Sequence, residues 1–309
     1  MVNMKSIFLL AIPLLTGAAT INAAVDPALL ALMPTNSSLL FGVHVQKVLA
    51  SPFGKYILTQ LPANDGMMQL AASTGFDYKN DLTEIVGATT LPDGTKANLY
   101  LARGTFQVTR FLALATATGS TITGYKSAQL VSLPDGENTT VAFLDSSTVA
   151  IGNLPAVMAA EDRYLAHAQF GGALAAKASA AGAAGDVWFA TVSPADQFMK
   201  STALPMPGLL KPVLETSVSV QFSDVGAVAT GEFTTSSTQQ AQALLAMAKF
   251  VSALAAAEGK ANPDAPNTLS SMQFAVHGTA LDVTLPIPEQ ALEQMYSARP
   301  VATRKASIR

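Results

Sequence analysis

Alternating apolar and polar side chains predict that β-strands make up much of this chain. In residues 39–45, Phe41, Val43 and Val45 lie on one face of an extended chain, and His44 falls on the opposite, more polar face. The same alternation predicts further strands at 85–90, 97–104, 121–133, 139–144, 148–152, 187–192, 217–222, 227–233, 272–276 and 280–285. Short turns rich in Pro, Asp and Gly join many of them, which favours antiparallel pairing.

Helices are predicted between these strands, and several of them begin at a proline. Ser51 followed by Pro52 is typical of a helix start, because the hydroxyl caps a free N–H group and Pro fits the first turn. That helix is expected to end near Leu61. Other helices are expected at 66–73, 108–118 and 155–165, after Pro194, at 236–258 and after Pro288. Antiparallel strands with separate helices indicate the α+β fold class.

The order of these elements recurs at a nearly constant offset. The hairpin at 86–103 corresponds to 217–234 and the hairpin at 139–152 to 272–285, which are offsets of 131 and 133 residues. This recurrence predicts two tandem α+β repeats, each a mostly antiparallel sheet with helices packed on one face. A single domain whose antiparallel elements merely recur is the alternative.

Composition divides the chain into five segments. Residues 1–24 are interpreted as a signal peptide, 25–166 as the first repeat, 186–298 as the second and 299–309 as a basic disordered tail. The Ala/Gly-rich residues 167–185 are interpreted as a linker. Their small side chains fit either a flexible segment or a weak helix.

The first 24 residues have the layout of a secretory signal peptide. Lys5 supplies the positive start, and Ile7 to Leu15 form an apolar core of about nine residues, too short to span a bilayer. Small residues follow this core. We expect cleavage near Ala23 or Ala24 and release of a soluble chain into the periplasm or the extracellular space.

Composition excludes several classes of function. The chain has no Cys, which removes disulfides, thiolate catalysis and cysteine-based zinc sites. Its 18 basic and 21 acidic residues give a net charge of −3, which argues against nucleic-acid binding. Without Lys5 and the four basic residues of the tail, the body carries 13 − 21 = −8. No later run reaches the roughly 20 apolar residues of a membrane-spanning helix.

Three short runs resemble segments of uncharacterised exported bacterial proteins. They are residues 51–54 (SPFG), 74–77 (TGFD) and 144–148 (LDSST). The resemblance covers about residues 28–165. It implies export, and because those proteins have no known activity it adds no site residue.

No local pattern indicates a catalytic, cofactor-binding or metal-binding residue. The chain lacks a Gly-rich phosphate loop, a G-x-S-x-G run and an H-E-x-x-H run. His44, His167 and His277 are isolated from one another, so we expect structural or exposed roles for them. A dispersed site would have to assemble distant groups, such as His44 with Asp145 or Asp282.

Two polar runs are interpreted as local structure, one as a helix cap and the other as a turn. Asp81 followed by Glu84 three residues later has the form of a capping box at a helix start. The run from Asp77 lacks the alternating ligands of a calcium loop. Asp145 to Thr148 suits a tight hairpin turn.

Two functional hypotheses differ in the role that they give to the bulky apolar side chains. Trp188, Phe189, Met67, Met68, Met199, Met206 and Met247 either fill the core or line an apolar pocket. The first case favours a non-catalytic binding or scaffold protein of the cell envelope, with no cofactor and an unknown partner. The second favours a carrier of a hydrophobic small molecule in a cleft between the repeats. An enzyme with a dispersed site is the third hypothesis.

Overall fold

A computed structural model of the chain describes residues 25–60, 65–90, 99–133, 138–198, 210–261 and 268–297. The predicted signal peptide, the predicted turns at 91–94 and 133–136 and the basic tail lie outside these residues, apart from Leu133.

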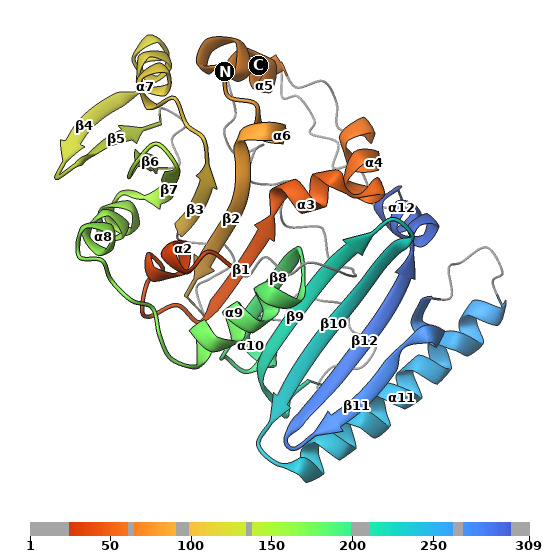
Figure 1. Cartoon of the computed structure of the whole chain (residues 1–309). Helices are drawn as coiled ribbons and strands as arrows, with labels where there is room; N and C mark the ends of the chain where they lie inside the picture. The colour runs from red at the N-terminus through yellow and green to blue at the C-terminus, as the bar shows by residue number, and fades with distance from the viewer. Residues whose placement is uncertain are drawn as a thin grey trace, which may run out of the picture.

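Twelve strands of the described chain form one sheet, and each neighbouring pair is antiparallel (Figure 1). The strand order is β11-β12-β10-β9-β8-β1-β2-β3-β7-β6-β5-β4. The strands are β1 (Leu39–His44), β2 (Leu82–Thr89), β3 (Leu99–Gly104), β4 (Thr121–Tyr125), β5 (Ala128–Ser132), β6 (Thr139–Phe143), β7 (Thr148–Asn153), β8 (Val187–Thr191), β9 (Val213–Ser223), β10 (Gly226–Thr235), β11 (Gln273–His277) and β12 (Ala280–Pro288).

Helices join and cover these strands, which confirms the α+β class. The helices are α2 (Pro27–Ala31), α3 (Val45–Ala50), α4 (Pro52–Gln60), α5 (Asp65–Thr74), α6 (Tyr78–Asp81), α7 (Val108–Ala117), α8 (Leu154–Leu165), α9 (Ala173–Ala184), α10 (Ala195–Phe198), α11 (Thr238–Ala261) and α12 (Glu289–Ser297), with a 3-10 turn at Thr268–Ser271.

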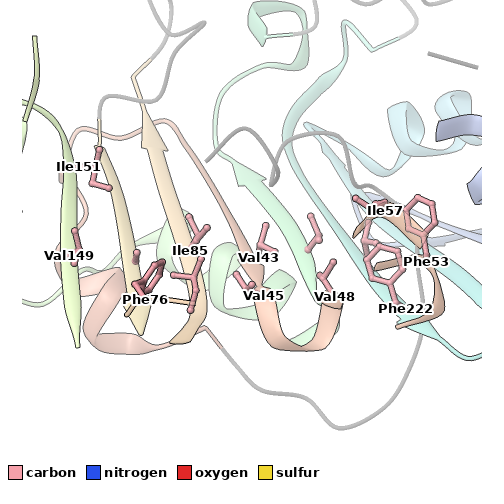
Figure 2. Packing of buried hydrophobic residues seen from close by; sticks show 14 of the residues in the cluster. Val43, Val45, Val48, Phe53, Ile57, Phe76, Ile85, Val149, Ile151 and Phe222 are labelled. Atoms are coloured by element: carbon pink, nitrogen blue, oxygen red, sulfur yellow. The ribbon is translucent and has the colours of Figure 1, made fainter. Parts of the chain in front are cut away.

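The helices pack on both faces of the sheet, so the expectation of one covered face is wrong. Ile85 and Val86 are adjacent in β2 and therefore point to opposite faces, and they belong to two different buried clusters. The Ile85 cluster includes residues of α3, α4 and α12 (Figure 2). The Val86 cluster includes residues of α2, α8 and α9. Most strands in the middle of the sheet are apolar on both faces, which requires cover on each side.

Strand β1 joins the two halves of the sheet. It pairs with β2 along one edge and with β8 along the other. Gly42 lies opposite Trp188 in this register, and a Cβ atom at Gly42 would lie 2.6 Å from the indole ring. Trp188 is 1% exposed. The absence of a side chain at Gly42 therefore makes room for the largest buried side chain of the sheet.

The Ala/Gly-rich segment forms helix α9, the second of the two alternatives left open by its composition. Leu174, Ala178 and Ala181 are buried, and α9 contacts β8, β9 and β1. Small side chains on this helix allow its backbone to lie close to the sheet. At Gly182 an added Cβ atom would lie 1.9 Å from a methyl carbon of Val25.

Two short helices flank β1 and have no clear signal in the sequence. Helix α2 begins at Pro27, and the carboxylate of Asp26 caps it by accepting a hydrogen bond from the Ala28 N–H. Helix α3 begins at Val45, a residue that the alternation assigned to the strand. Val45 stays buried in either conformation, so its hydrophobicity does not distinguish the two. Helices of five or six residues are too short to show a helical period.

We expect Gly42→Ala to lower the free energy of unfolding by about 1–3 kcal/mol, because the new methyl group overlaps the Trp188 ring in a filled core. The matched control is Gly124→Ala in β4, where no atom lies within 4 Å of the added Cβ position. The control should leave stability unchanged or slightly raise it. Urea unfolding measures both, and equal effects of the two substitutions would contradict the close fit at Gly42.

Candidate functional site

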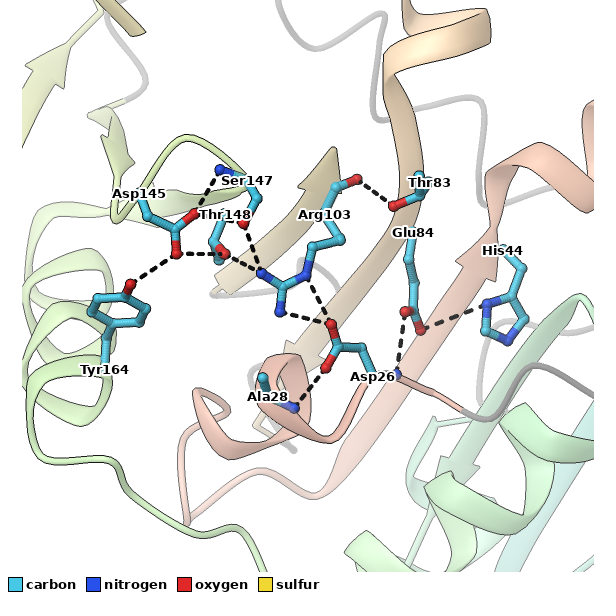
Figure 3. A network of polar contacts seen from close by, with 10 residues as sticks. All are labelled: Asp26, Ala28, His44, Thr83, Glu84, Arg103, Asp145, Ser147, Thr148 and Tyr164. Atoms are coloured by element: carbon cyan, nitrogen blue, oxygen red, sulfur yellow. Dashed lines mark hydrogen bonds and ion pairs between the residues drawn. The ribbon is translucent and has the colours of Figure 1, made fainter. Parts of the chain in front are cut away.

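A polar network runs across the ends of three neighbouring strands, and Arg103 at the end of β3 lies at its centre (Figure 3). The guanidinium donates from Nε to Asp26 Oδ2 at 2.8 Å, and its Nη2 lies 2.7 Å from the same oxygen. The other oxygen of Asp26 accepts the Ala28 N–H at 2.8 Å. Asp26 therefore caps α2 and binds the sheet at the same time.

One arm of the network is built on the hairpin turn before β7. The Arg103 Nη1 group donates to Ser147 Oγ at 3.2 Å and to the hydroxyl of Thr148. Asp145 accepts hydrogen bonds from the Ser147 N–H, from the hydroxyls of Ser147 and Thr148, and from Tyr164 on α8. Burial opposes ionisation of Asp145, but these donated hydrogen bonds outweigh it and hold its pKa below the usual range. The turn is confirmed, and it also carries a well-stabilised carboxylate.

The other arm joins β1 to β2 through Glu84 and His44. Glu84 Oε2 accepts the Asp26 N–H at 3.2 Å, and Glu84 Oε1 lies 3.8 Å from His44 Nδ1. His44 Nε2 lies 3.2 Å from the carbonyl oxygen of Gly182 on α9, which fits a donated hydrogen bond. The two side chains are 7% and 8% exposed. His44 was expected on a polar strand face, and α9 and the N-terminal segment bury that face.

Burial makes Glu84 an unusual carboxyl group. Its removal from water raises its pKa from 4.5 to about 7. The hydrogen bond from the Asp26 backbone and the charge of Arg103 lower this value, whereas the Asp26 carboxylate raises it. Glu84 Oε1 has no hydrogen-bond partner, although it lies beside His44. Glu84 is thus a buried carboxyl group that binds a proton near neutral pH.

Three further ion pairs anchor α9 and its surroundings. Asp186, just before β8, accepts the Phe222 N–H at 2.9 Å and lies 3.6 Å from Lys47 Nζ. Lys177 on α9 lies 2.5 Å from Glu232 and 3.2 Å from Glu215. Although burial disfavours the charged ammonium, these two carboxylates raise the pKa of Lys177 above its usual value. Lys177 therefore fixes α9 to β9 and β10, and Asp186 fixes the chain that follows α9 to β9 and to α3.

The structure separates the histidines and does not form either pair suggested for a dispersed site. His44 contacts Glu84, while Asp145 lies at the far end of the network (Figure 3). Asp282 instead contacts His277, 2.5 Å away on the exposed β11–β12 hairpin. His167 is exposed after α8, with a positive φ of 48°. Within the described residues no group of three or more His, Asp or Glu side chains has the arrangement of a metal site.

The capping box predicted from Asp81 and Glu84 is wrong. Asp77 is the N-cap of α6, its side chain accepts the Lys79 N–H at 3.0 Å, and Asp81 accepts the Asp77 N–H at 2.7 Å. Glu84 lies in β2, where its backbone is extended and its side chain is buried. The helix therefore begins four residues earlier than expected.

The aromatic and methionine residues suggested as pocket lining do not gather in the described chain. Trp188 belongs to the buried cluster that also contains α9 residues. Met68 and Met247 are 66% and 38% exposed, on α5 and α11. The side chains of Met67, Met199 and Met206 lie outside the described residues.

The polar network has a structural role, because its groups bind one another within the folded chain. Asp26, Arg103 and Asp145 each contact other protein groups, and Glu84 and His44 are almost entirely buried. Sequence reasoning missed Asp26, Arg103 and Tyr164, because each meets its partners only in the folded chain. A Pro after Asp26, typical of a capped helix, was the one local signal available.

Comparisons with known proteins identify the fold alone. No family model matches the chain, and no curated protein matches it. Two crystal structures of TP0453 are similar, crystal form IV with a TM-score of 0.54 at 11% identity and crystal form I with a TM-score of 0.52 at 12% identity. Each alignment covers 89% of this chain and 98% of the other. Among the described helices, none combines the length and the hydrophobicity needed to cross a bilayer.

We expect the stability of the protein to depend on the protonation of Glu84. Its pKa is about 7 in the folded chain and 4.5 when it is exposed to water in the unfolded chain, so its contribution is fully present below pH 4.5 and is lost as the pH rises through 7. The loss amounts to about 3 kcal/mol at most, at 1.36 kcal/mol per pKa unit. Urea unfolding between pH 4 and 8 should show this fall in wild type and a flatter profile in Glu84→Gln. Parallel profiles for the two proteins would contradict the assignment.

Proposed function

We propose that the chain is a non-catalytic binding or scaffold protein of the cell envelope, exported to the periplasm or the cell exterior. The observation that carries this proposal is the polar network, whose titratable groups bind one another and the first described residues of the chain. A general acid or base must reach its substrate. His44 and Glu84, at 7% and 8% exposure, instead serve to hold the N-terminal segment on the sheet.

The N-terminal segment supports the predicted position of cleavage. Val25 is 2% exposed, and Leu29 and Met33 are fully buried. Asp26 makes two sets of contacts, one to Arg103 and one to Glu84. Cleavage beyond residue 26 would remove both Val25 from the core and Asp26 from the network. Cleavage near Ala23 or Ala24 would leave them in the mature protein.

The strand order supports an internal duplication. The first half of the sheet follows the order β1-β2-β3-β7-β6-β5-β4, and the second follows β8-β9-β10-β12-β11. Strands β5 and β4 have no counterpart in the second half. In the remaining five strands of each half, the first three are adjacent and the last two are exchanged. We propose that residues 25–166 and 186–298 derive from one repeat, with α9 between them and with β1 and β8 as the shared boundary. A single fold with recurring hairpins remains the alternative.

The open face of the second half offers a surface for a polar partner. Helix α11 covers the opposite face of β10, β12 and β11, whereas on this face α9 lies over β8 and β9 and reaches β10 through Lys177 (Figure 1). Beyond α9, cross-strand registers place polar side chains of β10, β12 and β11 together, namely Thr230, Asp282, Thr284 and Gln273. Such a surface suits a protein or a glycan better than an apolar molecule.

The carrier hypothesis gains no support from Trp188. The indole ring fills the space above Gly42 and is 1% exposed, so it packs in the core and does not line a cavity. The polar face therefore favours the binding or scaffold role.

The export proposal is tested by expressing the full chain in a Gram-negative host and measuring the intact mass of the protein in the periplasmic fraction. We expect a mass that begins at Ala24 or Val25, because small residues precede both positions. Leu10→Arg, which interrupts the apolar core of the leader, should leave the uncleaved chain in the cytoplasm. Uncleaved wild-type chain in the cytoplasm would contradict export.

Native mass spectrometry of the same periplasmic material tests the binding role against the carrier. A chain without a bound small molecule agrees with the binding or scaffold proposal. A lipid-sized mass that leaves on denaturation would favour the carrier instead.

A further inference from the structure

Helix α11 has two apolar faces, although only one of them packs on the sheet. Ala241 and Leu244 are buried, and Leu244 belongs to the cluster that includes Leu281 of β12. The residues pointing the opposite way form a continuous apolar surface. This outer stripe consists of Ala243, Ala246, Met247, Phe250, Ala253, Leu254 and Ala257.

The bulky members of the outer stripe are unusually open to solvent. Met247, Phe250 and Leu254 are 38%, 62% and 51% exposed. Single exposed apolar residues are common, but a contiguous apolar surface typically marks an interaction site. A helix that is apolar all round is normally buried on all sides. The outer stripe is therefore an apolar surface of the kind that is normally buried, yet its bulky residues are exposed.

The spacing of the outer stripe matches a second helix. Ala243, Met247, Phe250, Leu254 and Ala257 are separated by four, three, four and three residues. This is the heptad spacing by which apolar side chains of one helix fit between those of another. Packing against a flat partner surface would not require apolar residues at alternating spacings of four and three. The pattern points to a helical partner.

We propose that the partner is the outer stripe of a second copy, packed antiparallel in a two-fold dimer. On either side of the point midway between Met247 and Phe250 the stripe begins with a bulky residue. Ala243 follows Met247 in one direction, and Leu254 and then Ala257 follow Phe250 in the other. An antiparallel pair then sets Met247 opposite Phe250 of the second copy, and Leu254 opposite Ala243. A two-fold contact requires such a self-complementary surface. Large residues face small ones at both ends, and the longest side chains meet at the centre.

Charge also favours a second copy. Lys249 is the one charged residue between Thr238 and Ala257, and at 100° per residue it projects from the flank of the stripe. The two copies therefore bring no charge into their contact. Helices that lie on membranes carry several Lys or Arg residues beside the apolar face. The one lysine beside the outer stripe gives this part of α11 little attraction for an anionic membrane.

The size of the stripe predicts a weak dimer. Bulky side chains bury about 150–250 Å² when fully covered, so the exposed parts of these three and of the four alanines offer on the order of 400 Å² per copy. A stable interface buries about 800 Å² per partner. The dimer formed by this stripe should therefore be weak and should dissociate on dilution.

Sedimentation velocity of the mature chain at about 5 to 500 μM tests the proposal. We expect the weight-average mass to rise toward that of a dimer with concentration. Phe250→Glu and Leu254→Lys should each remain monomeric over the same range, because they place a charge in the contact. Met68→Glu is the matched control, since Met68 is 66% exposed but lies on α5, and it should dimerise as wild type does.

Three results would overturn the proposal. They are a monomer at all concentrations, a dimer that survives both α11 substitutions, and a monomer that floats with anionic phospholipid vesicles and loses this binding in Phe250→Glu. The last result would assign the outer stripe to a membrane. Circular dichroism of each variant checks that it is folded, and the other α11 variant serves if one is not.

The antiparallel direction has its own test, because the chain contains no Cys. Ala243→Cys and Leu254→Cys each introduce one thiol into the stripe. When the two variants are mixed, a short thiol cross-linker should join one to the other. Each variant alone should cross-link poorly, since 11 residues of helix, or about 16 Å, separate equal positions in the antiparallel pair. Efficient cross-linking of Ala243→Cys to itself would indicate a parallel pair and overturn this arrangement.

Discussion

The double pairing of β1, with β2 on one side and β8 on the other, is the constraint on which the rest of the structure depends. It makes one sheet from two halves of the chain. Gly42 lets Trp188 lie across β1 on one face, and Phe41 and Val43 point to the other. His44 ends the strand and contacts Glu84. Both helical layers therefore meet at this strand.

Much of the polar chemistry of the chain is used at the ends of these central strands. Asp26 joins α2 to β3 through Arg103, and its backbone joins the same segment to Glu84 of β2. Burying such groups costs free energy unless each finds a partner, so a network of this kind fixes one arrangement of the chain. What remains for interaction lies elsewhere, on the polar face of β10, β11 and β12 beyond α9 and on the outer stripe of α11.

Local patterns predicted most of the elements, and distant contacts explain the failures. The Ser51 cap is confirmed, because its hydroxyl accepts the Gly54 N–H at 3.0 Å, a contact contained within four residues. Glu84 was misplaced because a capping box and a buried strand carboxylate look alike locally, and its deciding partner, Asp26, is 58 residues away. The cover over His44 comes from α9, 138 residues later. Alternation along a strand predicts which residues share a face, but it does not predict which elements pack on that face.

We expect the two halves of the sheet to unfold as one cooperative unit, because β1 and β8 pair along the junction between them. Trp188 is the only Trp of the chain and lies at this junction, so its fluorescence reports on the junction alone. Urea unfolding followed by Trp fluorescence and by far-UV circular dichroism compares the junction with the whole fold. We expect one transition with the same midpoint for both signals. A fluorescence change that precedes the loss of secondary structure would show that the halves separate first, and would contradict the claim.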